Sequence, residues 1–469
     1  MYRLSVYSLC GISLVSSCID GAIIPLVMSL AINYGDGSEW WVPVLASAFR
    51  MGTVFGLPTL GWLADKFGYR AIGIVALAFS VLFSFACIFV EDLILLAILR
   101  VGLGFFAFDL IGTNWINRNS IAPIQRRKNL ALYGLMLPIG VVLGMVVSGV
   151  VDSAETKYYS WKIVNIFWCV ALFLALIVLV NFVKPPMTNE EIERETGLNQ
   201  SSHEQDNVPN PSETTKQRHT GWKAKSEELT ASLSQRHDGK SHSLFGTLWR
   251  NINHFFLCVC FGITGGLLVT LVVMLCVEKL EFSSLDVSLT FVGFVGSAMA
   301  FVFLIYPQMV KRIGLVYTLV ILMCSVTIID AATAIVYFFD VSFLVVLVLS
   351  FVHYAGSISG ETSNKTLLLE QVPLAIEGRV MGLFLSTRQC SMVVGSYGSV
   401  FLYKDAATYA PWLAKTFLQL FGLALFCNRF FWARRGPSED SESVGLDLSG
   451  ISLQASQDAK SEKSALEAI

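Results

Sequence analysis

The chain of 469 residues is 54% hydrophobic and 14% charged, and its mean hydropathy is +0.62. A soluble domain carries about 25% charged residues, so this composition excludes an ordinary soluble protein and predicts one that is embedded in lipid. The formal net charge of −2 offers no basic surplus for a polyanion, and we expect no nucleic-acid partner.

Apolar runs long enough to cross a bilayer recur along the chain. A transmembrane helix needs about 20 apolar residues, and this rule predicts an all-α membrane protein with about twelve spans. Their expected ranges are 4–32, 41–63, 71–90, 93–114, 129–151, 161–183, 252–277, 287–308, 315–338, 342–365, 380–402 and 410–433. The first run is longer than the core of a signal peptide, and we interpret it as a span.

Two polar segments suggest how the chain is divided. Residues 184–250 start with two prolines and continue with mixed charge, which is typical of a disordered linker. The tail is rich in serine and acidic residues. The predicted organisation is a six-helix bundle over 1–183, a disordered cytosolic linker over 184–250, a second six-helix bundle over 251–433 and a disordered cytosolic tail over 434–469.

Basic residues in the connections predict the orientation. The termini and the loops after even-numbered spans carry thirteen of them: Arg3, Lys66, Arg70, Arg118, Arg126, Arg127, Lys128, Lys311, Arg312, Lys365, Arg379, Arg434 and Arg435. The opposite side carries four: Lys157, Lys162, Lys279 and Lys404. Because basic residues favour the cytosolic side, we expect both termini in the cytosol, in either the plasma membrane or an internal membrane.

A charged decapeptide, GWLADKFGYR at 61–70, separates the second and third runs. A related segment, IYPQMVKRIGLVY at 305–317, follows the eighth run, with Gly314 in the place of Gly68 and Lys311 in the place of Asp65. The halves on either side of the linker therefore read as two copies of one six-span unit.

The decapeptide resembles the signature loop of the major facilitator superfamily of transporters. Gly61, Leu63, Asp65, Gly68 and Arg70 match that pattern, whereas Tyr69 replaces a common basic residue. A second motif of the family resembles the stretch RVGLGFFA that begins at Arg100, with its glycine shifted by one. The resemblance implies twelve helices in two pseudo-symmetric bundles and transport of a small organic solute by alternating access, as a symporter or an antiporter.

The chemistry of the decapeptide suggests a conformational latch. Gly61 and Gly68 allow two helix ends to approach closely. The carboxylate of Asp65 can accept hydrogen bonds from the N-terminus of a neighbouring helix, whose dipole favours negative charge. We interpret these residues, together with Arg70, as a latch that closes the cytosolic side and is remade in each cycle. A fixed turn that only sets the topology is the alternative.

Charged residues inside the runs are the candidates for a transport site. An Arg or Asp at a helix centre costs roughly 2.5–3.5 kcal/mol to insert, so such residues should face a cavity or one another. Seven are expected, namely Asp20, Arg50, Arg100, Asp109, Asp330, Glu361 and Arg388. In the family, spans one, four, seven and ten line the path, which favours Asp20, Arg100, Asp109, His353 and Glu361 as lining residues. Arg50, Asp330 and Arg388 are then expected in supporting pairs.

Two of these residues receive specific hypotheses. Asp20 lies in the middle of a span, where it is the candidate for proton coupling, or it is a structural partner of Arg50 or Arg100. Arg100 is a fixed cation suited to a carboxylate or phosphate, or it pairs with Asp20. Asp109 follows nine residues later, which on a continuous helix is half a rotation and about 13 Å away.

Other functional classes lack their motifs. There is no P-loop for an ATP-driven pump and no His–Asp constellation for a membrane enzyme, so we expect no enzyme activity and no cofactor. Cys258 and Cys260 are two residues apart and would lie on different faces of a helix, so we expect no metal site.

An uncoupled facilitator and a non-transporting receptor remain alternatives. The expected partners are a small organic solute, membrane lipid and, for a coupled transporter, protons, with the protein a monomer. Bends are expected at Pro25, Pro138 and Gly265–Gly266.

Overall fold

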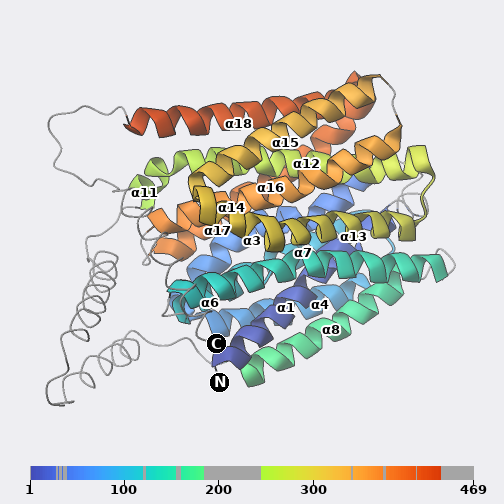
Figure 1. Cartoon of the computed structure of the whole chain (residues 1–469). Coiled ribbons are helices and arrows are strands. Elements are labelled where there is room, and N and C mark those ends of the chain that lie inside the picture. The colour runs from blue at the N-terminus through green and yellow to red at the C-terminus, as the bar shows by residue number, and fades with distance from the viewer. Residues whose placement is uncertain are drawn as a thin grey trace, which may run out of the picture.

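The computed structural model describes residues 2–27, 30, 34, 40–119, 123–154, 160–183, 244–339, 342–372, 376–407 and 409–434, and the regular elements in these ranges are helical. Figure 1 shows long helices lying side by side, those of the first half (blue to teal) on one side and those of the second (green to red) on the other. The all-helical class predicted from the sequence is confirmed.

The first half is built from helices that run alternately in opposite directions. They are α1 (Tyr2–Ala22), the 3-10 turn η1 (Ile24–Leu26), α3 (Trp41–Phe67), α4 (Tyr69–Cys87), α5 (Leu93–Phe105), α6 (Asp109–Asn119), α7 (Pro123–Ala154) and α8 (Ser160–Phe182). Helices α5 and α6 together make one crossing over Leu93–Ile116.

The second half repeats this plan. Its elements are α11 (Leu244–Arg250), α12 (Ile252–Leu280), α13 (Ser284–Ala300), the π-helical turn η2 (Phe301–Ile305), α14 (Tyr306–Ile313), α15 (Leu315–Phe338), α16 (Phe343–Gln371), α17 (Glu377–Phe401), the π-helical turn η4 (Leu402–Ala406) and α18 (Ala410–Arg434). Residues 284–313 form one crossing through α13, η2 and α14.

Among the described residues, ten helices are long and apolar enough to cross a membrane. Two more, α3 and α17, contain 27 and 25 residues, which at 1.5 Å per residue gives about 40 and 38 Å. These two complete the twelve crossings expected from the sequence.

The same helix pairs pack most closely in both halves. In the first half α1 crosses α7, where a Cβ added at Gly144 would lie 1.9 Å from the carbonyl oxygen of Cys18. In the second half α12 crosses α17, where a Cβ at Gly266 would lie 2.1 Å from the carbonyl oxygen of Met392. Small residues allow such close crossings in membranes, and their equivalent positions make the two bundles pseudo-symmetric.

The two related loops have the same backbone geometry. Gly68 joins α3 to α4 with φ 91°, and Gly314 joins α14 to α15 with φ 82°. In each loop the glycine N–H donates to a carbonyl four residues earlier, Ala64 at 2.9 Å and Val310 at 3.0 Å. A positive φ favours glycine, so this conformation explains why the two segments share it.

Among the described residues four crossings depart from a regular helix, and one of them is the eleventh, in which the π-helical turn η4 follows α17. The first bends where Pro25 was expected to bend it, because α1 ends at Ala22 and a 3-10 turn follows. The fourth is interrupted at 106–108, between α5 and α6. The eighth contains the π-helical turn η2. By contrast, Pro138 lies within the unbroken helix α7 and Gly265–Gly266 within α12.

The predicted linker and tail are mostly outside the described residues. This applies to residues 184–243 and to the tail beyond residue 434. The last seven residues of the predicted linker form the helix α11, Leu244–Arg250. A short helix therefore precedes α12.

Candidate functional site

Three charged residues of the first half gather near its centre. Asp20 lies in the last turn of α1, Arg50 in α3 and Arg100 in α5. Arg50 and Arg100 are buried, with 7% and 1% of their surface exposed. Asp20 and Arg50 are the charged groups within electrostatic reach of Arg100. Nε and Nη2 of Arg100 are buried without a hydrogen-bond partner among the described residues.

The second half contributes a charged group from α16 and α17. The Nε of Arg388 forms an ion pair with Oε1 of Glu361, and both side chains are about one-fifth exposed. Lys365 lies one turn along α16 from Glu361 and within electrostatic reach of it. These residues lie close to the boundary between the halves, since Arg388 and Arg50 both act on Tyr354 of α16.

Asp109 connects the two groups across that boundary. Its Oδ1 accepts a hydrogen bond from Ser13 Oγ of α1 at 3.3 Å. Lys365 and Arg388 of the second half are within electrostatic reach of the same carboxylate. Asp109 is therefore an acid of the first half that interacts electrostatically with two bases of the second.

The interruption of the fourth crossing changes the expected relation of Asp109 to Arg100. The sequence argument assumed a continuous helix, whereas α5 ends at Phe105 and α6 begins at Asp109. The predicted half rotation between the two side chains therefore does not apply. The break places Asp109 in the first turn of α6, where the helix dipole favours a carboxylate.

His353 occupies a different place from the other expected lining residues. Its Nδ1 lies 2.8 Å from Oδ1 of Asp330, and Lys415 Nζ lies 3.0 Å from the same oxygen. All three are at most 1% exposed, and Lys415 Nζ also lies 4.5 Å from the ring centroid of Trp412. The cluster joins α15, α16 and α18 within the second half. Asp330 thus lies in a charged cluster, and His353 is part of it.

The latch residues divide between two roles. Asp65 accepts a hydrogen bond from the Tyr69 hydroxyl, and its Oδ2 lies 3.9 Å from Nε of Arg379 in the first turn of α17. A Cβ at Gly378 would lie 3.3 Å from both carboxylate oxygens, so the N-terminus of α17 packs against Asp65. Arg70 instead donates from Nη2 to the carbonyl of Val180 at 2.7 Å, which is a contact within the first half.

The glycines of the latch support this packing. A Cβ at Gly61 would lie 3.0 Å from Leu110 Cδ2 and 3.6 Å from the Gly378 carbonyl oxygen. Further along the same interface, Ser386 Oγ of α17 donates to the Val54 carbonyl of α3 at 2.5 Å. The halves are thus in contact at the end where α1 begins, which is the predicted cytosolic end.

The opposite end is closed by hydroxyl groups. Ser284 Oγ of α13 donates to Oδ2 of Asp152 at the end of α7 at 2.6 Å. Ser288 Oγ donates to the Met145 carbonyl at 2.9 Å. Helices α7 and α13 belong to different halves, so the two halves contact each other near both ends of the bundle.

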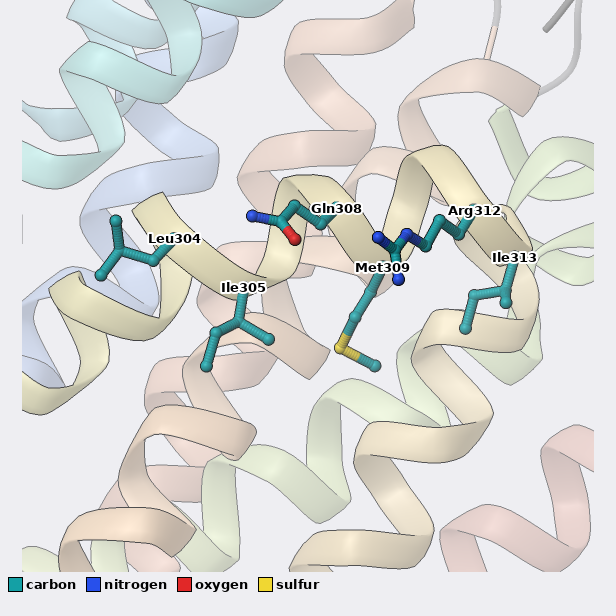
Figure 2. Close-up of a pocket in the computed structure, with 6 residues that line it drawn as sticks. All are labelled: Leu304, Ile305, Gln308, Met309, Arg312 and Ile313. Atoms are coloured by element: carbon teal, nitrogen blue, oxygen red, sulfur yellow. The ribbon is translucent and has the colours of Figure 1, made fainter. Parts of the chain in front are cut away.

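A pocket is lined by residues of the eighth crossing and by none of the charged site residues described above. Figure 2 shows its lining on η2 and α14: Leu304, Ile305, Gln308, Met309, Arg312 and Ile313. Leu304 is 65% exposed and Ile305 48%, which is typical of a surface that faces lipid. It does not include any of the predicted site residues.

Comparison with known proteins fits this geometry. The sequence profile of the Major Facilitator Superfamily matches residues 9–396. The chain belongs to the major facilitator superfamily. As a member of this superfamily it is a multi-pass membrane protein of a solute-transporter family.

Solved structures of major facilitator transporters share the fold. The human organic anion transporter MFSD10 (TETRAN) is 15% identical with a TM-score of 0.66, covering 90% of this chain and 99% of its own. The proton:xylose symporter XylE bound to 6-bromo-6-deoxy-D-glucose is 15% identical, with a TM-score of 0.68 and coverage of 91% and 96%. The xylose transporter XylE from E. coli in a partially occluded inward open conformation is 13% identical, with a TM-score of 0.64 and coverage of 94% and 100%. A search among curated proteins found no match.

Several residues of this facilitator were missed by the sequence analysis. Lys415 lies inside a predicted span but was absent from the set of charged residues within spans. Lys365 was assigned to a cytosolic connection, whereas α16 continues to Gln371. A search for every Lys in the predicted spans finds both, since residue 365 is the last of the predicted span 342–365. The Asp152–Ser284 contact has no sequence signal.

Proposed function

We propose that this protein is a secondary transporter that moves a small organic solute by alternating access between its two helical halves. The observation that carries the proposal is the charged group at the boundary, where Asp109 of one half faces Lys365 and Arg388 of the other. Charges in such a place are costly to insert and can be rearranged when the halves rock. The contacts near both ends of the bundle are candidates for the gates that open in turn.

Coupling to protons is the finer part of this proposal. Asp20 is half-buried in the last turn of α1 and is one of the two charged groups within reach of Arg100. A carboxylate in this position can bind and release a proton as its surroundings change. One structural neighbour, XylE, is named as a proton symporter, which shows that the fold accommodates coupling. Symport and antiport both fit the arrangement.

The topology and partners follow from the same proposal. Both termini lie in the cytosol, on the side where the decapeptide connects α3 to α4. The partners are the solute, lipid and, when Asp20 titrates, protons, with the monomer as the working unit. Asp20, Arg100, Asp109 and Glu361 are the proposed lining residues, and Arg50 and Arg388 lie beside them.

Transport of protons in liposomes tests the coupling. Purified protein is reconstituted with a trapped pH-sensitive dye and an imposed pH gradient, and pools of labelled metabolites are added. We expect solute-dependent proton movement in the wild type and its loss in Asp20→Asn, because an amide cannot titrate, while solute exchange without a gradient continues. Asp92→Asn, in the exposed connection before α5, serves as the matched control.

Other results of the liposome experiment would favour the alternative functions. If the wild type moves solute without protons, Asp20 is a structural partner and the protein is an uncoupled facilitator or uses another ion. If no pool moves in either direction, the non-transporting receptor is favoured and the proposal of transport is wrong.

A further inference from the structure

The charges at the centre of the bundle leave one positive charge over. Among the described residues the carboxylates there are Asp20, Asp109 and Glu361, and the bases are Arg50, Arg100, Lys365 and Arg388. Three acidic side chains thus share this region with four basic ones. A net charge in a membrane-embedded site is costly unless a ligand or counter-ion balances it.

The excess is located in the first half. Glu361 is paired with Arg388, and Asp109 faces Lys365 across the boundary. These four charges balance one another. Asp20 remains as the single acid within reach of Arg100, beside Arg50, so two guanidinium groups share one carboxylate.

Arg100 has donors that no described residue uses. Only 1% of its surface is exposed, and its Nε and Nη2 are buried without a hydrogen-bond partner. An unsatisfied buried donor of a charged group is unfavourable, and guanidinium donors match the two oxygens of a carboxylate or phosphate. Arg50 interacts electrostatically with Arg100 and also with Tyr354 of α16 in the second half.

We propose that the transported solute carries a net negative charge, as a carboxylate or a phosphate ester, and that Arg100 and Arg50 bind that group in the first half. The inference rests on the proposed transport function and names its substrate class. A bound anion balances the excess charge, whereas a cationic solute adds to it. An inorganic anion has the same charge, and the experiment separates the two sources.

Binding to matched probes tests the charge of the ligand. Thermal unfolding of the purified protein is followed at constant chloride with benzoate, benzamide and benzylamine, with lactate and lactamide, and with glucose 6-phosphate and glucose. Chloride is titrated separately. We expect stabilisation by at least one anionic member and not by its neutral or cationic analogue. We expect Arg100→Gln and Arg50→Gln each to weaken that binding by about 10- to 100-fold, the effect of losing hydrogen bonds to a charged group.

Two further variants control for folding and for surface charge. Arg100→Lys keeps the charge without the guanidinium, and its affinity for the anion is expected to lie between those of the wild type and Arg100→Gln. If the glutamine variant does not fold, the lysine variant still tests the role of Arg100. Arg312→Gln removes an exposed arginine of α14 and should bind the anion as the wild type does.

The contrary results are distinct. The proposal is overturned if none of the organic anions stabilises the protein, so that only neutral probes, cationic probes or chloride do. It is also overturned if an anion stabilises the wild type and both glutamine variants equally. Uptake of the stabilising probe into liposomes is measured next. A probe that binds through Arg100 but is not moved leaves the anion site standing and contradicts transport, whereas a neutral probe that is moved supports transport and contradicts the anion site.

Discussion

Replacing Lys415 by Met is expected to destabilise the protein by about 3–5 kcal/mol, the range found when one member of a buried ion pair is removed. The ammonium group is fully buried and lies 3.0 Å from Asp330, which is itself 0% exposed. Without Lys415 the carboxylate keeps only His353, and a lone buried charge is costly. The expected result is a large fall in the thermal unfolding midpoint and in the yield of monodisperse protein.

The double variant Asp330→Asn with Lys415→Met distinguishes charge from packing. Because it removes both charges, we expect it to be more stable than Lys415→Met alone, with coupling between the two sites of about 0.5–3 kcal/mol. Lys279→Met, at the exposed end of α12, serves as the control and should unfold like the wild type. Additive losses in the double variant would show that the three residues do not act as an ion cluster.

Replacing Asp65 by Asn is expected to open the predicted cytosolic end. The substitution removes the negative charge that Arg379 and the first turn of α17 face. A loss of about 1–2 kcal/mol, from the lower part of the range for hydrogen bonds to charged groups, changes the ratio of closed to open states roughly 5- to 30-fold. The expected result is a larger population in which α3 and α17 are apart at that end.

Distances between spin labels can measure this population. Labels at Phe67→Cys and Arg312→Cys lie on exposed positions of different halves, in a background in which the exposed Cys390 is replaced by Ser. Arg70→Gln is the matched control, since Arg70 bonds to the Val180 carbonyl within its own half and should not change the distribution. If both variants shift the distance distribution equally, Arg70 is part of the latch, and its assignment to a contact within the first half is wrong.

The helices themselves could be predicted because bilayer thickness sets their length. The ninth crossing was expected at 315–338, and α15 spans Leu315–Phe338. The break after Phe105 could not be predicted in this way, because the apolar run from 93 to 114 looks the same whether the helix is continuous or interrupted. The run contains no proline at the break, so nothing local indicates it.

The partners of the charged residues were less predictable than their presence. Because burying a charge in the membrane costs free energy, a charged residue within a span is predicted to have a partner. The partner comes from a helix distant in sequence, so the sequence pattern does not identify it. His353 was grouped with Arg100 through the family resemblance, whereas α15 and α18 supply its neighbours. Arg70 bonds to a backbone carbonyl, which every residue offers, so no residue type marks that contact.

The two ends of the bundle should respond differently to dissolved electrolyte. Arg379 is 47% exposed, and its contact with Asp65 at 3.9 Å is an ion pair open to counter-ions, which screen charges over about 8 Å at physiological ionic strength. The Ser288–Met145 contact at the other end joins an uncharged hydroxyl to a carbonyl and offers little for ions to screen. Raising the salt concentration on the decapeptide side alone should therefore favour opening towards that side. Because the Ser284–Asp152 contact also places one carboxylate at the other end, a transporter of this construction would sense the ionic composition of the compartment on the decapeptide side more strongly than that of the other.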